Sequence, residues 1–232
     1  MQIQILPLLK GAKQARGLTV IIDVFRAFSL EAYLQYKGVK EILPVQSIAE
    51  AMQLKKDLAD VILIGERNGI KVEGFDYGNS PSEVMLQNLQ DKVIVHTTSA
   101  GVQGLIAADK ASEIVTGALV NAKATCQYID KQKPTIVSLV PMGWNGIERA
   151  LEDDICAEYM LSLLQGEKNI SLEDKIRELK KGSGSRFFDP NLPQFPTEDF
   201  ALCTSLNRFS GVNRAIYKNN RYHMVWEEVH GS

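Results

Sequence analysis

The chain has 232 residues, of which 45% are hydrophobic, and its formal net charge is -2. This composition fits one large α/β domain or two small intertwined ones, and the charge gives no argument for nucleic acid or a membrane surface as a partner. No apolar run approaches the roughly 20 residues of a membrane span. The three cysteines are too widely spaced for a disulfide pattern, so we expect a reduced, cytoplasmic setting.

Residues 1–90 are predicted to form a βαβαβ unit. The run 17–24 is nearly continuous in apolar and β-branched residues, which is typical of a strand covered on both faces. Ser47 and Glu50 are spaced as a capping box at the start of a helix. In chain order, the predicted elements are an edge strand at 1–6, a strand at 17–24, a helix at 29–38, a strand at 42–45, a helix at 46–56 and a strand at 61–66.

A long polar loop at 67–81 follows the third strand of this unit. A loop of this length in a compact domain is usually functional or disordered, and its glycine and aromatic content favours an ordered, functional loop. Ser80 and Pro81 can begin the next helix, as its cap and its first helical residue.

Residues 91–181 are predicted to repeat the first unit. Asp23 and Thr97 lie 74 residues apart, and so do Val61 and Thr135. We therefore infer a duplication, and the alternative is a chance likeness between βα units. The predicted elements are strands at 93–96, 114–117 and 135–140, and helices at 100–108, 121–129, 148–161 and 172–181.

Residues 182–232 are predicted to be a linker and a C-terminal segment packed on the same fold. The run 182–200 is rich in Gly, Ser, Pro and Asn, whereas 215–217 and 224–226 are strand-like. We therefore predict an α/β fold with three α/β/α layers, a mixed or mostly parallel sheet and two similar βαβαβ repeats. The edge strand at the N-terminus could also pair across a homodimer.

Acidic and guanidinium side chains follow two of the predicted strands. Asp23 and Arg26 come after one strand, and Glu66 and Arg67 come at the end of another. In parallel sheets such strand ends carry ligand chemistry. Arginine matches phosphate oxygens bidentately, and Mg²⁺ takes one or two carboxylates with substrate oxygens and water. The structural alternative is an ion pair between side chains, either Asp23 with Arg67 or Glu66 with Arg26, and no metal.

Polar residues at the predicted helix starts extend this set. The turn Thr97, Thr98, Ser99, Ala100 and Gly101 opens a helix directly after a strand, so its N–H groups and hydroxyls can bind an anion, or simply cap the helix. Asn79 and Ser80 lie at a second helix start and can add donors. Asp153 is the member of the acidic run 152–154 most suited to be a further metal ligand; the alternative is a solvated acidic helix start.

Five motifs resemble, in order, those of the 2-phosphosulfolactate phosphatase (ComB) family. The run Gly74-Phe75-Asp76-Tyr77-Gly78-Asn79-Ser80-Pro81 is the most specific of them. The others lie at residues 23–27, 65–69, 97–101 and 152–153, so the resemblance covers roughly residues 18–160. It implies a distinct α/β fold and a Mg²⁺-dependent phosphomonoesterase, which removes phosphate from 2-phospho-3-sulfolactate on the route to coenzyme M.

The combined hypothesis places Mg²⁺ on Asp23 and Glu66, with Asp153 as a possible third ligand. Arg26 and Arg67 would clamp the phosphate. The helix start at 97–101 would bind either phosphate oxygens or the sulfonate and carboxylate end. The attacking group is either a water activated by the metal or Asp23 as a covalent nucleophile. The alternatives are a phosphatase for another phosphorylated hydroxy acid and a non-catalytic sensor of such an anion.

Overall fold

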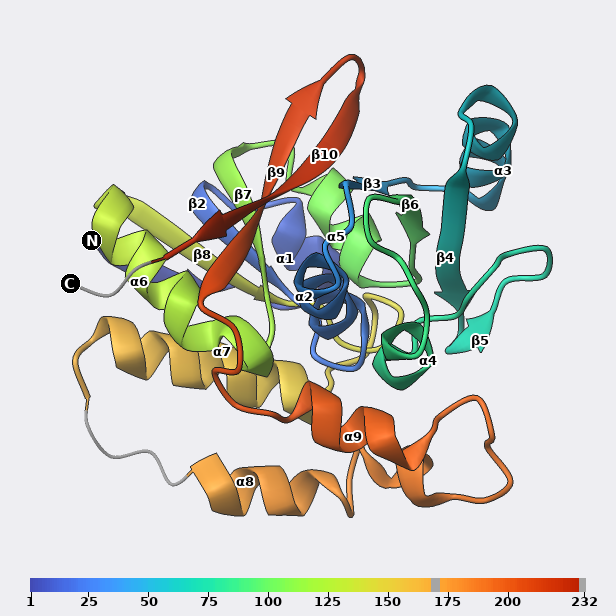
Figure 1. Ribbon diagram of the computed structural model, residues 1–232. Helices are drawn as coiled ribbons and strands as arrows, with labels where there is room; N and C mark the ends of the chain where they lie inside the picture. The colour runs from blue at the N-terminus through green and yellow to red at the C-terminus, as the bar shows by residue number, and fades with distance from the viewer. Residues whose placement is uncertain (168–171, 230–232) are drawn as a thin grey trace.

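A computed structural model describes residues 1–167 and 172–229 of the chain. Its described strands form one ten-stranded sheet in the order β1-β8-β2-β7-β9-β10-β3-β6-β4-β5, flanked by helices (Figure 1). The strands are β1 Gln2–Ile5, β2 Gly17–Ile22, β3 Glu41–Pro44, β4 Val61–Arg67, β5 Ile70–Lys71, β6 Val93–Thr97, β7 Ala111–Gly117, β8 Ile136–Pro141, β9 Gly211–Lys218 and β10 Arg221–Glu228.

Nine α-helices and two short 3-10 helices lie among the described residues. They are α1 Leu8–Ala12, α2 Ala27–Tyr36, α3 Ile48–Asp57, α4 Pro81–Met85, α5 Gly101–Ala107, η1 Leu119–Asn121, α6 Ala122–Gln132, α7 Leu151–Leu164, α8 Leu172–Leu179, η2 Ser185–Phe188 and α9 Thr197–Cys203. The predicted elements at residues 1–161 are all present, with bounds shifted by a few residues.

The sheet consists of two parallel halves joined by an antiparallel hairpin. Strands β1, β8, β2 and β7 pair in parallel, and so do β3, β6 and β4. The hairpin β9–β10 lies between them and pairs antiparallel with β7 on one side and β3 on the other. The predicted α/β fold with a mixed, mostly parallel sheet and flanking helices is therefore confirmed.

The strands of the two predicted repeats interleave. Strand β2 belongs to the segment 1–90 but lies between β7 and β8, and β6 belongs to the segment 91–181 but lies between β3 and β4. The strand order from β8 to β4 is symmetric about the β9–β10 hairpin: β7 corresponds to β3, β2 to β6 and β8 to β4. The two segments thus do not form separate sheets, and the duplication itself stays a prediction. Residues 168–171 and 230–232, which fall within the predicted ranges 91–181 and 182–232, lie outside the described residues.

Local sequence signals explain where several elements begin. Ser47 accepts a hydrogen bond from the Glu50 N–H (3.1 Å) at the start of α3. Ser80 accepts one from the Glu83 N–H (3.2 Å) at the start of α4, and Pro81 is the first residue of that helix. Both caps satisfy N–H groups that lack a partner within the first helical turn, as their sequences predict.

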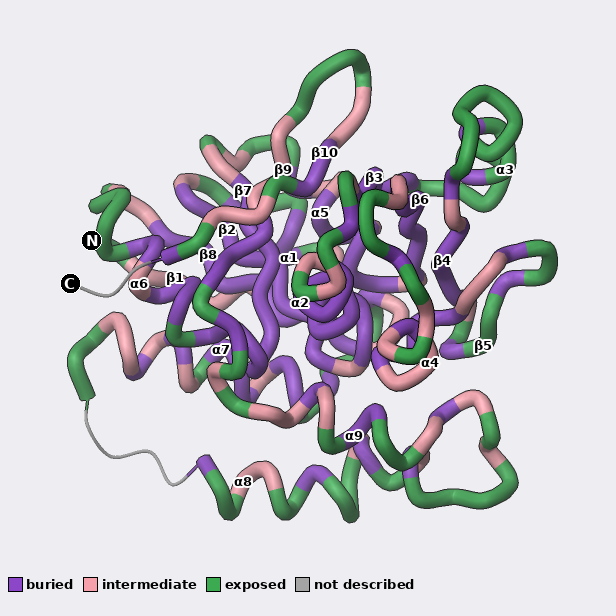
Figure 2. Tube along the Cα trace, in the orientation of Figure 1, coloured by how far each residue is buried: buried purple, intermediate pink, exposed green. Residues whose placement is uncertain are grey.

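Helices cover both faces of the half that contains β8 and β2. Helices α6 and α7 pack on one face, and α1 and α5 pack on β8 and β2 from the opposite face, while α3 packs on β4 and β6. Strand β2 is buried throughout except at its first residue, Gly17. Figure 2 shows that the buried residues concentrate in the middle of the sheet and in α2, whereas the hairpin tip and the outer loops are mostly exposed. The near-continuous apolar sequence of β2 follows from this double coverage.

The segment predicted as a linker has structure of its own. It contains η2 and the beginning of α9, and it runs below the helices α2 and α4 in Figure 1. Phe187, Phe195 and Phe200 pack against Phe25 or one another, with ring centroids 4.9–6.2 Å apart. These aromatic contacts hold the segment against the residues that follow β2.

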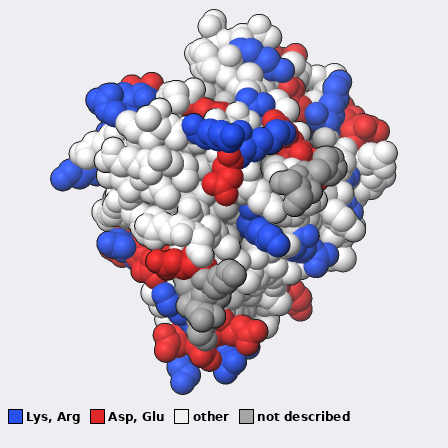
Figure 3. All heavy atoms as spheres, turned by 90° about the vertical axis from the view of Figure 1, so that its left-hand side faces the viewer, with Lys and Arg blue, Asp and Glu red and all other residues white. Residues whose placement is uncertain are grey.

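The outer surface carries both signs of charge. Figure 3 shows Lys and Arg interspersed with Asp and Glu on the face it presents. No helix in the described part of the chain has the length and apolar character needed to cross a membrane.

Candidate active site

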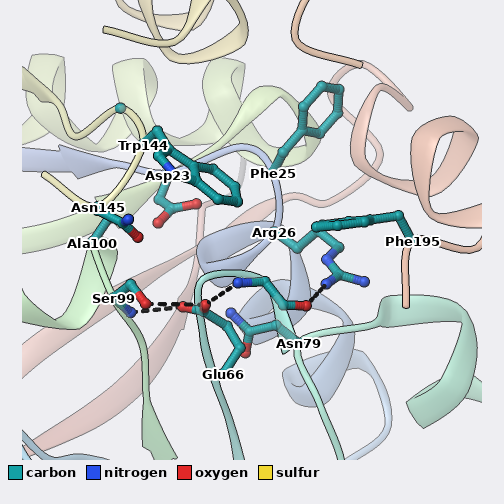
Figure 4. A pocket seen from close by; sticks show the side chains of 12 residues that line it. Asp23, Phe25, Arg26, Glu66, Asn79, Ser99, Ala100, Trp144, Asn145 and Phe195 are labelled. Carbon is teal, nitrogen blue, oxygen red and sulfur yellow. Dashed lines mark hydrogen bonds between the residues drawn. The ribbon is translucent and has the colours of Figure 1, made fainter. Parts of the chain in front are cut away.

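A small pocket lies where loops from both halves of the sheet meet. Residues after β2 and β8 come from one half, and residues of or after β4 and β6 come from the other. Figure 4 shows their side chains around one space. The lining residues are Asp23, Phe25, Arg26, Glu66, Gly69, Asn79, Ser99, Ala100, Gly143, Trp144, Asn145 and Phe195.

Asp23 lines the pocket and is held by two backbone N–H groups. Its carboxylate accepts hydrogen bonds from Ala27 N (3.2 Å) and Gly101 N (3.0 Å). A side chain at Gly101 would place its Cβ 2.9 Å from Asp23 Oδ2, so only glycine lets the helix start approach this closely. Burial raises the pKa of Asp23 to about 7; the carboxylates of Glu66 and Glu152 add to the rise, and the two N–H groups oppose it.

Glu66 is the second acid of the pocket, and its carboxylate is also bound by N–H groups. It accepts hydrogen bonds from Ser99 N (2.6 Å) and Gly69 N (2.7 Å), and Ser99 Oγ donates to it at 3.1 Å (Figure 4). Only 8% of Glu66 is exposed. The helix-start donors that were expected to bind an anionic ligand therefore hold the two carboxylates: Ser99 N binds Glu66, and Gly101 N binds Asp23.

Arg26 lines the pocket, but its guanidinium group is already paired. Nη1 donates to Asp199 (2.8 Å) and to the Gln194 carbonyl (3.0 Å), and Nη2 donates to the Gly69 carbonyl (3.2 Å). The ring of Phe195 lies 4.9 Å from the guanidinium carbon. The positive charge of Arg26 is thus neutralised by Asp199, which is itself fully buried.

Arg67 does not line this pocket. It lines a neighbouring, more open hollow, where its Nη2 donates to Thr97 Oγ1 (3.0 Å) and its Nη1 donates to the Glu66 carbonyl (2.7 Å). Thr98 also lines the hollow and caps helix α5 by accepting from Val102 N (3.0 Å). The two predicted ion pairs, Asp23 with Arg67 and Glu66 with Arg26, are not formed.

Asn79 and Ser80 have different surroundings. Ser80 caps α4 and donates to Asp199 (3.0 Å), and it does not line the pocket. Asn79 does line the pocket, and its Oδ1 lies 2.9 Å from His96 Nε2. The other ring nitrogen of His96 lies 3.0 Å from Glu31, and His96 and Glu31 are fully buried. This chain of contacts fixes the Asn79 amide with its nitrogen toward the pocket, as Figure 4 shows.

Asp153 lies behind the pocket, not in its lining. Its two oxygens accept hydrogen bonds from Val24 N (2.7 Å) and Gly143 N (2.8 Å), so it ties the loop after β2 to the loop after β8. Burial raises its pKa well above the ordinary value, and the carboxylates of Asp23 and Glu152 add to this effect. Asp154 instead forms an ion pair with Arg149 on the surface.

Several residues of the site were not predicted from the sequence. Trp144, Asn145 and Phe195 line the pocket, and Arg186 stacks behind two of them, 4.6 Å from the Trp144 ring and 5.2 Å from the Phe195 ring. Both aromatic residues occur in glycine- or proline-rich loops, where a large aromatic side chain is a signal for an ordered site. His96 and Asp199 act from within structural elements, and no local signal marks them.

Comparison with known proteins gives a consistent result. A model of the 2-phosphosulpholactate phosphatase family matches residues 5–195, a span that includes every residue lining the pocket. A protein named probable 2-phosphosulfolactate phosphatase from Bacillus subtilis is 34% identical over 191 residues, covering 81% of this chain and 82% of the relative. Proteins of the same name from Carboxydothermus hydrogenoformans and Clostridium perfringens are 42% and 33% identical, over 67% and 70% of this chain and 64% and 67% of theirs. The chain belongs to the 2-phosphosulfolactate phosphatase family.

Proposed function

We propose that the protein is a Mg²⁺-dependent phosphatase, which hydrolyses 2-phospho-3-sulfolactate to 3-sulfolactate and phosphate in a route to coenzyme M. Family membership and the names of the relatives support the reaction and the substrate. The observation that carries the proposal is the pair of buried carboxylates, Asp23 and Glu66, that face one pocket on the carboxyl side of four strands.

The donor set fits a magnesium ion held by two carboxylates. Among the described residues, no group of three or more His, Cys, Asp or Glu side chains is arranged to bind a metal. Mg²⁺ needs fewer, because it usually keeps several waters and takes one or two carboxylates together with substrate oxygens. Mutual repulsion with Glu66 helps to raise the pKa of Asp23, and a cation between them would remove that repulsion.

Asp23 and Glu66 would therefore hold the ion. Asp153 would not bind the ion but would position the loops around it. Its oxygens accept from Val24 N, next to Asp23, and from Gly143 N in the loop after β8, which positions both loops. When bound, Mg²⁺ would offset the negative charge of the phosphate and of the two acids. It would also favour the ionised form of Asp23, which the covalent alternative requires.

Other side chains of the pocket would bind the phosphate, exclude water and support the lining residues. The Asn79 amide nitrogen can donate to a phosphate oxygen, because His96 holds its oxygen on the other side. Trp144 and Phe195 narrow the pocket and limit access of water. Arg26 keeps Phe195 and Asp199 in place through its stacking and its ion pair.

Phosphate release from 2-phospho-3-sulfolactate tests the proposal. We expect turnover with Mg²⁺, and loss of turnover in EDTA that is restored by added Mg²⁺. A panel with 2-phospholactate and other phosphorylated hydroxy acids tests the substrate, and faster release from one of these would assign a different one. Binding without release under any metal condition would favour the sensor. A trapped phosphoenzyme would favour Asp23 as the nucleophile, and its absence would favour water.

The same proposal includes a cytoplasmic enzyme, acting on a small anionic metabolite as a possible homodimer. The three cysteines are free and buried, which fits a reducing compartment. In the described sheet, β1 pairs only with β8 and so leaves one edge available to a second copy. Light scattering at micromolar concentration distinguishes a monomer from a dimer.

A further inference from the structure

The hollow around Arg67 differs in charge from the pocket beside it. Seven residues line it: Gln46, Arg67, Asn68, Thr98, Ser99, Gln103 and Asn145. They include one cation and no acid, and the others carry amide or hydroxyl groups. An arginine surrounded by neutral polar groups is suited to bind an anion.

No acid among the described residues neutralises the charge of Arg67. Its three hydrogen bonds go to the carbonyls of Glu66 and Gln46 and to the hydroxyl of Thr97. No carboxylate in the described part of the chain lies within ion-pairing distance of it. These bonds to neutral groups hold the guanidinium in place and leave part of its five N–H donors free.

The hollow and the pocket adjoin. Ser99 and Asn145 line both, and in Figure 4 they lie on the side of the pocket opposite Arg26 and Phe195. The boundary is held by hydrogen bonds from Asn145 Nδ2 to Asn68 Oδ1 (2.8 Å) and from Asn68 N to Ser99 Oγ (3.1 Å). A small ligand with two anionic groups on adjacent carbons can therefore present one to each space.

We propose that the hollow binds the anionic group of the substrate that is not hydrolysed, a sulfonate or a carboxylate, through Arg67. This inference rests on the proposed function, because it places the phosphate beside Asp23 and Glu66. Arg67 is then a residue that determines specificity by recognising the acid end of the substrate, and it does not clamp the phosphate together with Arg26.

Binding of the product tests the hollow independently of turnover. We would titrate 3-sulfolactate into the wild-type protein and into Arg67→Gln by calorimetry. The Kd is expected to rise about 10- to 100-fold in Arg67→Gln, because a charge-assisted contact is lost. Arg177→Gln, which removes the same charge from an exposed arginine in α8, is the matched control and should leave the Kd unchanged. Equal binding by wild type and Arg67→Gln, or no binding by wild type at millimolar 3-sulfolactate, would overturn the proposal.

A second variant guards against misfolding of the first. Gln103 lies on α5 at the edge of the hollow, where its Nε2 donates to the Gln46 and Thr98 carbonyls (2.9 and 3.2 Å). Gln103→Glu replaces these two donors by an acid and leaves Arg67 itself in place. It should also weaken 3-sulfolactate binding, and retained affinity would count against the proposal. Titration of 2-hydroxyethanesulfonate and of lactate then shows whether the Arg67-dependent group is the sulfonate or the carboxylate.

Kinetics separate this inference from the proposed function. The ratio of kcat/KM for 2-phospho-3-sulfolactate to that for isopropyl phosphate should fall about 10-fold or more in Arg67→Gln. An equal fall for both esters would place Arg67 on the phosphate and refute the proposal. If wild type binds 3-sulfolactate through Arg67 but releases no phosphate, the hollow stands and the proposed function fails. If wild type releases phosphate but its binding of 3-sulfolactate does not depend on Arg67, the proposed function stands and the role of the hollow fails.

Discussion

The pocket and the hollow share Ser99 and Asn145, yet their charges are arranged in opposite ways. In the pocket, two acids are buried and bound by backbone N–H groups, and the arginine is neutralised by Asp199. In the hollow, the described partners of the arginine are all neutral, and none of the seven lining residues is an acid. Nearness to a strand end therefore does not decide what an arginine does. The groups that contact the arginine decide whether its charge is available to a ligand. Of the two, Arg67 keeps an uncompensated charge and Arg26 does not.

The largest expected effect is on catalysis in the pocket, and it should not extend to binding in the hollow. Asp23→Asn should lower kcat by at least about 10³-fold, whether Asp23 holds the metal or attacks phosphorus. It should leave 3-sulfolactate binding at the hollow nearly unchanged, because Asp23 does not line that space. Phosphate-release assays and calorimetry on the same variant measure both. Full activity would remove Asp23 from the mechanism.

A pH dependence of stability tests Asp23, the acid of the pocket whose pKa is raised. Burial raises the pKa of Asp23 from 3.8 to about 7, with repulsion from Glu66 and Glu152 adding to it. Without a divalent cation, its contribution to the free energy of unfolding is therefore fully present below pH 4 and is lost as the pH rises to 7. The expected loss is on the order of 4 kcal/mol.

Urea unfolding at pH 4.5 and pH 7.5, in EDTA and in Mg²⁺, measures this dependence. Mg²⁺ should offset the loss at pH 7.5, because it binds the ionised acids of the folded state. A fall of equal size in Asp23→Asn would assign the dependence to other groups.

Arg26→Met tests whether the arginine of the pocket is mainly structural. It would leave Asp199 buried without its cation, and we expect the free energy of unfolding to fall by about 3 kcal/mol. This lies at the low end for a broken buried pair, because Asp199 still accepts from Ser82 N (2.8 Å) and Ser80 Oγ (3.0 Å). Arg177→Gln, in an exposed pair, should change it by less than about 0.5 kcal/mol. Similar urea midpoints for the two variants would contradict the structural role.

Asn79→Asp tests how far the negative charge of the pocket affects catalysis, because it makes the pocket still more acidic. It removes the amide donor and adds a third carboxylate, so kcat/KM should fall by about 10²-fold. Asn79→Ala removes the donor only and should cost less. Steady-state assays with 2-phospho-3-sulfolactate measure both variants, and a larger loss in Asn79→Ala would mean that charge in the pocket is not what Asn79 controls.

Much of the fold could be predicted from local sequence. The double coverage of β2, the caps Ser47 and Ser80 and the edge position of β1 follow from patterns within a few residues. The interleaving of strands could not be predicted, because β2 reads the same whether it lies beside β3 or between β7 and β8. The central position of β9 and β10 could not be predicted either, since a short strand pattern contains no information about its neighbours.

The candidate site shows the same limit. Asp23, Glu66 and Asn79 occur in recognisable motifs, and the structure brings them to one pocket. The partner of Arg26 is Asp199, which lies 173 residues away in a segment whose composition resembles a linker. The hidden partners His96 and Glu31 orient Asn79 from the core. Pairings of this kind depend on the tertiary fold. The sequence therefore indicates which charged residues are candidates for the site, but it does not predict which of them are neutralised by a partner.

The hairpin β9–β10 has a consequence for synthesis of the chain. It occupies the middle of the sheet but follows every other described strand in the sequence. On a ribosome, β7 and β3 would therefore emerge with unpaired edges and wait for the hairpin before the two parallel halves could join. A nascent chain stalled before residue 211 would expose both edges, and that is the stage at which a chaperone would protect it most.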